Sequence, residues 1–414
     1  MKKKIIAMIC LVSVLLSAIV VAVIPASAAP TDWIDRDPVE NVDYSFAVLG
    51  DIQSTTYADV KNNTINLDKM FTWILKNRGT KNIQYVFGLG DSVETLTTYA
   101  EAFRNPKEWA LAGAQFARLN GKIPYGVVRG NHDDEAGYHR NICNKNYQNQ
   151  MDGFFYDSTK PATLGNSMSN SYRKITIGNH KYLMLFLDFR ATPESLEWAN
   201  DVIYQNHDCK VIISVHAYLT GSGGFYKQDI GSSNVDDTVL EWIAFDGSYL
   251  WNNLFSQHEN IFMVLCGHYG IDNPIVQTRT GKEGNEVIEI LVNPQNYERE
   301  DPCGTLMLLN FTEGAQKIRI EYFSPSKNKY FRAGNQKTMT LDAGVLPIFD
   351  PNASSAEGET ESDSLNAEDP SGGFGDALVG EGNPYGLVIL IGSALVGAAL
   401  VGGTTLLIVK KKKK

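Results

Sequence analysis

Apolar residues alternate between short continuous runs and helically spaced positions from about residue 44 onwards. Residues 44–51, YSFAVLGD, form an apolar run that ends in a carboxylate. Residues 65–79 then place apolar side chains at helical spacing and end at Gly79, a common stop signal. Strand and helix patterns alternate again in residues 83–91, 108–121 and 123–133. This order predicts βαβ units and a largely parallel sheet with helices on both faces.

The pattern continues less regularly towards the C-terminus. Residues 171–189 predict a hairpin that turns at GNH, and Thr192 followed by Pro193 predicts the start of a helix over 193–207. Further strands are expected at residues 210–219, at 260–270 and in pairs over most of 274–340.

One long segment of this region lacks such periodicity. Residues 135–170 are rich in Asn, Tyr, Gly and Asp, and we expect them to form a long loop over a site. Residues 42–341 as a whole predict one α/β domain in which two sheets pack as a β-sandwich with flanking helices.

Both ends of the chain carry patterns of export and membrane attachment. MKKK, an apolar run to Ile24 and the small residues of PASAAP predict a signal peptide over residues 1–28, with an uncleaved anchor as the alternative. Residues 386–409 are 24 residues without a charge. At about 1.5 Å per residue, a helix of this length spans a bilayer. The five lysines of residues 410–414 are expected to form a cytoplasmic tail.

The stretch before this apolar segment is acidic. Residues 350–384 contain nine Asp or Glu and no Lys or Arg, which together with low hydrophobicity predicts a disordered stalk. We therefore expect an exported protein, held in the cell membrane by one helix, with its folded domain outside. A cell-wall sorting signal is the alternative for the C-terminus, although no LPxTG-type motif precedes the apolar segment.

Composition narrows the class of protein further. The chain is 43% apolar and 20% charged, which is typical of a globular protein with a core. Its net charge is -10 and no basic stripe appears in the middle, so a nucleic-acid-binding surface is not expected. The pairing of the cysteines beyond the signal peptide stays open, as does the oligomeric state. Those cysteines are Cys143, Cys209, Cys266 and Cys303.

Polar and ionisable residues follow five of the predicted strands at their carboxyl ends. In chain order these strand ends carry Asp51 and Gln53, then Asp91 and Glu94, then Asn131, His132 and Asp133, then His216, and finally His268. Any one of these groups alone could be only a turn. Because ligands gather beyond the carboxyl ends of strands in α/β sheets, we expect the whole set to meet at one edge.

The segments LGDIQ, GLGDSVE, GNHDD, SVH and CGHYG resemble the signature of the calcineurin-like metallophosphoesterase family. That signature runs D-x-H, G-D-x-x-[DE], G-N-H-[DE], a lone His and G-H-x-H, and the resemblance extends from Asp51 to Gly270. It implies a four-layer αββα fold. It also implies a metal-dependent phosphoric ester hydrolase that cleaves a phosphate mono- or diester.

The resemblance assigns roles to the residues at the strand ends. One divalent ion would be held by four residues, Asp91, Asn131, His216 and His268. Asp91 would be shared with a second ion, and such a pair can generate a hydroxide nucleophile near neutral pH. Imidazole ligands favour Mn, Fe or Zn over Mg or Ca. His132 would donate a proton to the departing alkoxide, with its ring held by Asp133 or Glu94.

Two positions depart from the family pattern. Gln53 stands where the family has the His of D-x-H, and Gly270 stands where it has the last His of G-H-x-H. Both missing imidazoles belong to the second metal site, which keeps Asp51, the shared Asp91 and the Gln53 carbonyl.

Three hypotheses follow from these departures. The protein is an enzyme with two metals, one of them weakly held, or an enzyme with one metal, or a catalytically inactive surface protein that binds a partner. We favour an active enzyme, because both losses fall on one metal site and the residues of the first site are all present.

Overall fold

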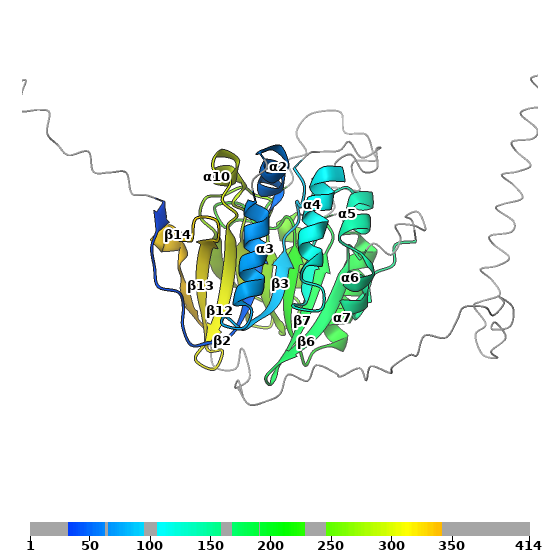
Figure 1. Ribbon diagram of the computed structural model, residues 1–414. Coiled ribbons are helices and arrows are strands. Elements are labelled where there is room, and N and C mark those ends of the chain that lie inside the picture. The colour runs from blue at the N-terminus through cyan, green and yellow to red at the C-terminus, as the bar shows by residue number, and fades with distance from the viewer. Residues whose placement is uncertain are drawn as a thin grey trace, which may run out of the picture. The chain divides into compact units, whose positions relative to one another are not determined.

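The computed structural model describes residues 32–62, 65–94, 106–158, 168–189, 191–227 and 246–341 (Figure 1). These residues belong to the first of two compact units, Met1–Gly358. Several predicted segments lie outside them and stay predictions: the signal peptide over 1–28, the stalk over 350–384, the apolar segment over 386–409 and the tail over 410–414. Within the described ranges, no helix is both long and apolar enough to cross a membrane.

The first of two mixed sheets contains the strands that lead to Asp51, Asp91 and Asn131. Its order is β1 (Trp33–Ile34), β14 (Lys329–Phe331), β13 (Lys317–Ser324), β12 (Leu306–Thr312), β2 (Val42–Leu49), β3 (Ile83–Gly88) and β4 (Tyr125–Val127), and β15 (Thr338–Thr340) also pairs with β13. Strands β2, β3 and β4 run parallel, whereas β12 pairs antiparallel with both β2 and β13.

The second sheet contains the strands that lead to the two later histidines. Its order is β10 (Ile275–Thr280), β11 (Glu286–Leu291), β9 (Ile261–Cys266), β8 (Lys210–Val215), β7 (His180–Leu187), β6 (Ser171–Ile177) and β5 (Gly153–Phe154). Strands β11, β9, β8 and β7 run parallel, and hairpins flank them. The predicted βαβ units form, since β2, β3 and β4 are parallel, but both sheets are mixed because hairpins such as the predicted one of β6 and β7 add antiparallel neighbours.

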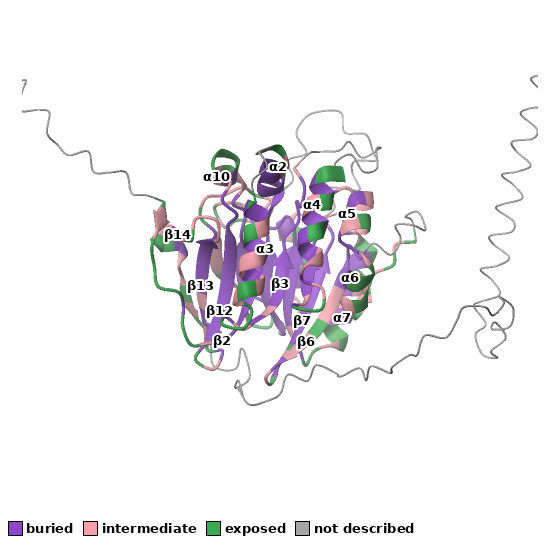
Figure 2. Cartoon of the chain, in the orientation of Figure 1, coloured by how far each residue is buried: buried purple, intermediate pink, exposed green. Residues whose placement is uncertain are grey.

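Alternation along β2 explains how the two sheets pack. Tyr44, Phe46 and Val48 point into an apolar core that they share with residues of the second sheet such as Tyr182 and Phe186. The intervening residues of β2 face the helices on the opposite side of the first sheet. Figure 2 shows the central strands, such as β2, β3, β12 and β7, buried along most of their length. Residues two apart in a strand lie on the same face, so a single strand contributes to two cores.

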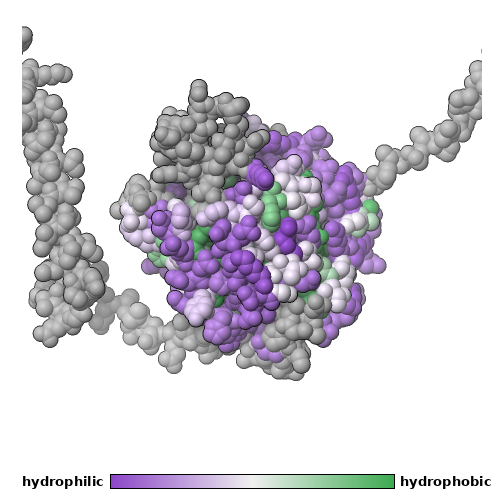
Figure 3. Space-filling view, turned by 180° about the vertical axis from the view of Figure 1, so that it is seen from behind, coloured by the Kyte–Doolittle hydropathy of each residue, from purple (hydrophilic) through white to green (hydrophobic). Residues whose placement is uncertain are grey.

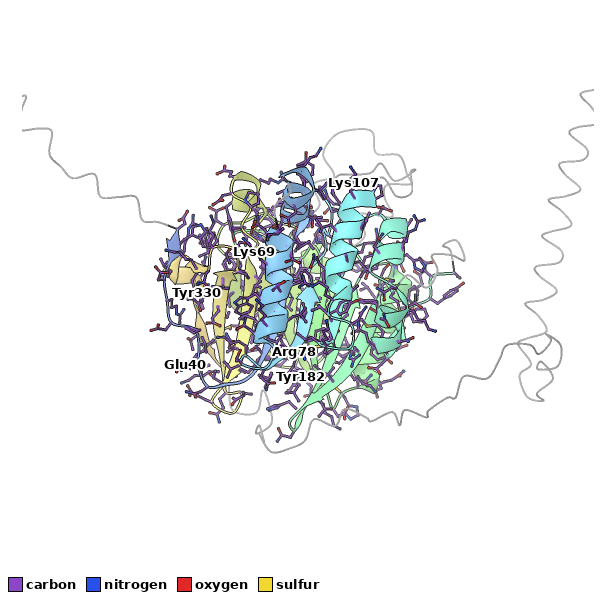
Figure 4. All side chains as sticks on the ribbon, viewed as in Figure 1. Glu40, Lys69, Arg78, Lys107, Tyr182 and Tyr330 are labelled. Atoms are coloured by element: carbon purple, nitrogen blue, oxygen red, sulfur yellow. The ribbon has the colours of Figure 1, made fainter. Side chains whose placement is uncertain are left out.

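Helices cover the outer faces of both sheets. Helices α3 (Asn66–Asn77) and α4 (Pro106–Ala117) pack their apolar sides on the first sheet, and their charged residues Lys69 and Lys107 face outwards (Figure 4). Helix α7 (Pro193–Gln205) covers the second sheet together with α9 (Gly247–Leu250) and the turn Trp251–Phe255. The described domain therefore has the four layers αββα.

The prediction of a long loop over residues 135–170 is wrong for its first half. Helices α5 (Glu135–Asn141) and α6 (Lys145–Gln150) form there. The polar residues that suggested a loop are caps, since Asp134 accepts a hydrogen bond from Gly137 N and Asn144 accepts one from Tyr147 N. The capped helices bury Tyr138 and Tyr147 against the core. By contrast, Thr192 caps α7 through a capping box, as its position before Pro193 predicted.

A buried ion pair joins the two sheets just beneath their carboxyl ends. Arg129 follows β4 and Asp188 follows β7, and Arg129 Nη2 donates to Asp188 Oδ2 at 2.8 Å. Both side chains are 1% exposed. Arg129 Nη1 also donates to the Asp133 carbonyl at 3.1 Å, so the same guanidinium holds the turn that carries Asn131 and His132.

Replacing Arg129 with Met is expected to lower the free energy of unfolding by about 3–5 kcal/mol, because it removes a buried guanidinium that pairs with a buried carboxylate. Urea unfolding of the purified protein measures the change. The matched control is Lys181→Met, which breaks the exposed Lys181–Asp208 pair and should leave the stability almost unchanged. Equal losses in the two variants would contradict the assignment.

Candidate metal centre

Four of the predicted residues converge at the carboxyl edge of the two sheets. Asn131 Oδ1 lies 2.9 Å from His216 Nε2 and 2.8 Å from His268 Nδ1. His216 Nε2 lies 3.3 Å from Asp91 Oδ2 and 3.2 Å from His268 Nδ1. Ligand atoms of Asp91, His216 and His268 all lie within 4.8 Å of one another. We call Asp91, Asn131, His216 and His268 the metal cluster.

Backbone strain and close packing place these side chains. Asp91 and His268 have φ angles of 45° and 66°, a region that costs a residue other than glycine roughly 1–3 kcal/mol. A Cβ at Gly90 would lie 2.6 Å from His216 Nδ1, and a Cβ at Gly130 would lie 2.2 Å from Asp91 Oδ1. Glycine at both positions therefore lets the turns after β3 and β4 approach the cluster closely.

Hydrogen bonding fixes which nitrogen of His216 faces the cluster. Nδ1 lies 2.8 Å from the Leu89 carbonyl. A carbonyl only accepts, so Nδ1 donates and Nε2 is left to act as a ligand. Burial opposes a charge on this ring, but the carboxylates of Asp91 and Asp51 raise the pKa of His216 to about 9. The same negative charge would attract a divalent cation.

The His268 ring is neutral at pH 7. Burial and the nearby His216 lower the pKa of His268 to about 3, so its Nδ1 lone pair is available to a metal. The ring of Tyr226 meets the His268 ring edge-on, with 4.6 Å between centroids. Two imidazoles, one carboxylate and one amide oxygen form a donor set that suits Mn, Fe or Zn. The cluster therefore fits the divalent ion that the resemblance implied.

His132 lies beside the cluster and is held by main-chain groups. Its backbone N–H donates to Asp91 Oδ1 at 2.8 Å. Its ring Nδ1 lies 2.6 Å from the Glu94 carbonyl and must donate to it, which leaves Nε2 for a transferable proton. The prediction that Glu94 holds this ring is correct in the residue but wrong in the group, because the contact is the backbone oxygen. The Glu94 carboxylate instead accepts from Arg299 Nη2 at 3.0 Å.

Asp133 does not hold the His132 ring, and this part of the prediction is wrong. Its carboxylate accepts hydrogen bonds from Ser92 N at 2.7 Å and from Gly130 N at 3.0 Å. These bonds join the turn after β3 to the turn after β4. Asp133 thus fixes the position of Asp91 relative to Asn131. Burial and the neighbouring Asp91 raise the pKa of Asp133 to about 7.

The residues predicted for the second metal are in amide-rich surroundings. Asp51 is buried and accepts from His268 N at 3.1 Å and from Asn293 Nδ2 at 2.6 Å. Gln53 Nε2 donates to Gln295 Oε1 at 2.6 Å. Gln53 opens helix α2 (Gln53–Asn62), and Gln295 opens helix α10 (Gln295–Glu300). Figure 1 shows these two helices side by side above the strand ends.

Sequence reasoning missed Asn293, Gln295 and Arg299. The stretch NPQNYER follows the apolar run that becomes β11, and β11 runs parallel to β9. The rule that placed the other site residues beyond strand ends would have found Asn293, had it been applied to this strand. The reading of residues 274–340 as strand pairs left no place for α10.

Comparison with known proteins now decides the family. The model of the calcineurin-like phosphoesterase family matches residues 44–296, which include every member of the metal cluster. The chain belongs to this family. A curated relative of this chain, the uncharacterized protein YvnB of Bacillus subtilis (strain 168), is 26% identical over 329 residues. That alignment covers 76% of this chain but only 23% of YvnB, so the chain spans less than a quarter of its relative.

Two solved structures are similar to this chain, each at 11% sequence identity. One is GAP50, the anchor in the inner membrane complex of Plasmodium, with a TM-score of 0.35, covering 72% of this chain and 88% of GAP50. The other is a 5'-nucleotidase precursor from Thermus thermophilus, with a TM-score of 0.39, covering 75% of this chain and 55% of the precursor.

Proposed function

We propose that this protein is an extracellular, membrane-anchored phosphoesterase that hydrolyses a phosphate mono- or diester with the help of a divalent metal. The observation that carries the proposal is the convergence of Asp91, Asn131, His216 and His268 next to His132. Family membership supports ester hydrolysis as the reaction type. Export and anchoring rest on the sequence patterns of residues 1–28 and 386–409.

Each residue of the site has a distinct part in this reaction. The metal cluster would hold the ion, which when bound polarises a phosphoryl oxygen and lowers the pKa of a water molecule. His216 contributes Nε2, because the Leu89 carbonyl occupies its Nδ1. His132 would deliver the proton from Nε2 to the departing alkoxide, while the Glu94 carbonyl keeps the ring oriented. Asp133 acts indirectly, by holding the turns after β3 and β4 together.

A panel of phosphate mono- and diesters, tested with the full chain in detergent, checks this proposal. We expect hydrolysis to stop after chelation and to return with Mn, Fe or Zn, and less well with Mg or Ca, because two ligands are imidazoles. The preferred ester class identifies a mono- or diesterase. If no ester is hydrolysed with any of these ions, the protein is not an enzyme of this kind, and the inactive surface protein becomes the better hypothesis.

A further inference from the structure

The position of the family's second metal does not fit a metal ion in this chain. Where the pattern supplies two imidazoles, this protein has Gln53 and Gly270. A Cβ at Gly270 would lie 2.6 Å from Asn296 Oδ1 and 3.0 Å from Gln295 Nε2. Amide side chains therefore occupy the space into which a histidine would project.

Asp51 is also engaged with hydrogen-bond donors. His268 N donates to both of its carboxylate oxygens at 3.1 Å, and Asn293 Nδ2 donates to Oδ2 at 2.6 Å. These donors compensate part of the charge of the buried carboxylate. Asp51 thus positions the backbone of His268, a member of the metal cluster.

A guanidinium lies close to the same place. Arg299 Nη2 donates to Gln295 Oε1 at 3.2 Å, the atom that also accepts from Gln53 Nε2. The same Nη2 donates to Glu94 Oε1 at 3.0 Å, and the Glu94 carbonyl holds the His132 ring. Arg299 is therefore linked to Gln53 through the Gln295 side chain. It also bonds the side chain of Glu94, the residue whose carbonyl contacts the His132 ring.

Arg299 still has donors to offer. Among the described residues, both of its hydrogen bonds come from Nη2, and its side chain is 52% exposed. Nη1 and Nε are then available to an incoming anion. Guanidinium groups bind phosphate through two parallel N–H bonds, and they remain charged at any physiological pH.

One buried oxygen favours the opposite conclusion. Gln53 Oε1 is buried and accepts no hydrogen bond from any described residue. It could serve as a ligand, but a single amide oxygen is a poor replacement for two imidazoles. A count of bound ions tests whether this oxygen completes a second site.

We infer that this protein holds a single divalent ion in the metal cluster and that Arg299 binds the phosphoryl oxygens that the second ion would otherwise contact. The inference rests on the proposed function, since it describes how the same site binds its phosphate ester. Gln295 and Glu94 accept hydrogen bonds from the guanidinium and so position it, and Gln53 in turn bonds Gln295.

The first experiment counts metal ions. The full chain is stripped with a chelator, equilibrated with excess Mn or Zn, freed of loose ions and analysed for metal per chain. We expect one ion per chain in the wild type and the same count in Arg299→Ala. Two ions per wild-type chain would overturn the inference.

The second experiment uses inorganic phosphate as the probe and needs no turnover. Calorimetry of the metal-loaded full chain should give a phosphate dissociation constant about 10- to 100-fold weaker for Arg299→Ala, the effect of losing a charge-assisted contact. Arg299→Lys should fall between the two, because it keeps the charge and loses the fork. The matched control is Arg319→Ala, which removes an exposed arginine paired with Glu313 near the other end of β2.

The outcomes separate the two proposals. Unchanged phosphate affinity in Arg299→Ala, with wild-type metal content, would show that Arg299 only anchors α10 to Glu94. An equal loss in Arg319→Ala would show that the effect is general surface charge, and would likewise overturn the inference. If phosphate binding behaves as expected but no ester is hydrolysed, the inference holds and the proposed catalysis fails.

Discussion

Replacing His216 with alanine is expected to remove most of the bound metal and, with it, hydrolysis. His216 is 0% exposed and contributes the central nitrogen of the metal cluster, 2.9 Å from Asn131 Oδ1 and 3.3 Å from Asp91 Oδ2. Loss of groups that only orient a ligand weakens metal binding about 10- to 100-fold, so loss of the ligand itself should cost at least about 100-fold in affinity. Metal content after dialysis and a metal titration measure the change.

His258→Ala is the matched control, because this half-buried histidine bonds to Asn200 and is no part of the cluster. It should retain the wild-type metal content. Asn131→Ala is expected to lose metal in the same way as His216→Ala. Full metal loading in His216→Ala would mean that the ion binds elsewhere or that the four side chains do not share it.

Replacing His132 with alanine is expected to lower kcat by about 100-fold or more while the metal stays bound, which is the usual contribution of a general acid. The reason is positional. The ring bonds to the Glu94 carbonyl through Nδ1, an atom outside the metal cluster, so the ring can be removed without removing a ligand. Steady-state kinetics combined with metal analysis measure both quantities on the same preparation.

An ester with a very acidic leaving alcohol provides the internal control for His132→Ala. Such a leaving group needs little help from a proton, so the variant should lose much less activity on it. Unchanged kcat on an ordinary ester would show that the wrong acid has been chosen. Loss of metal together with loss of kcat would show that His132 supports the cluster rather than the leaving group.

Periodicity and strand-end chemistry were sufficient to predict most of the fold and the centre of the site. The runs that became β2, β3, β8 and β9 are continuous and apolar because both faces of these strands are buried. The residue after such a run therefore lies at the carboxyl edge of its sheet. Asp91, Asn131, His216 and His268 could therefore be brought together before any distance was known.

The features that escaped prediction depend on long-range packing. Nothing local to GNHDD indicates that the Asp133 carboxylate turns back to Ser92, 41 positions earlier, rather than to the adjacent ring. Helices α5 and α6 are too short for a clear period, and their caps use the same residues as loops. Arg299 reaches Glu94 across 205 positions, a contact that only the folded sandwich creates.

The exterior of the described domain contrasts with its apolar interior. Seen from behind, the described surface is mostly hydrophilic, with apolar side chains scattered over it (Figure 3). Scattered apolar residues are ordinary on a soluble domain.

Asp91 and Asn131 extend from the first sheet, whereas His216 and His268 extend from the second. An ion bound by all four residues would link the two sheets, and its binding free energy would add to the stability of the folded domain. Activity and stability would then depend on the same bonds between the metal and its ligands. A chain without its ion would be inert. It would also unfold more readily between the two sheets and be cleaved faster by a protease.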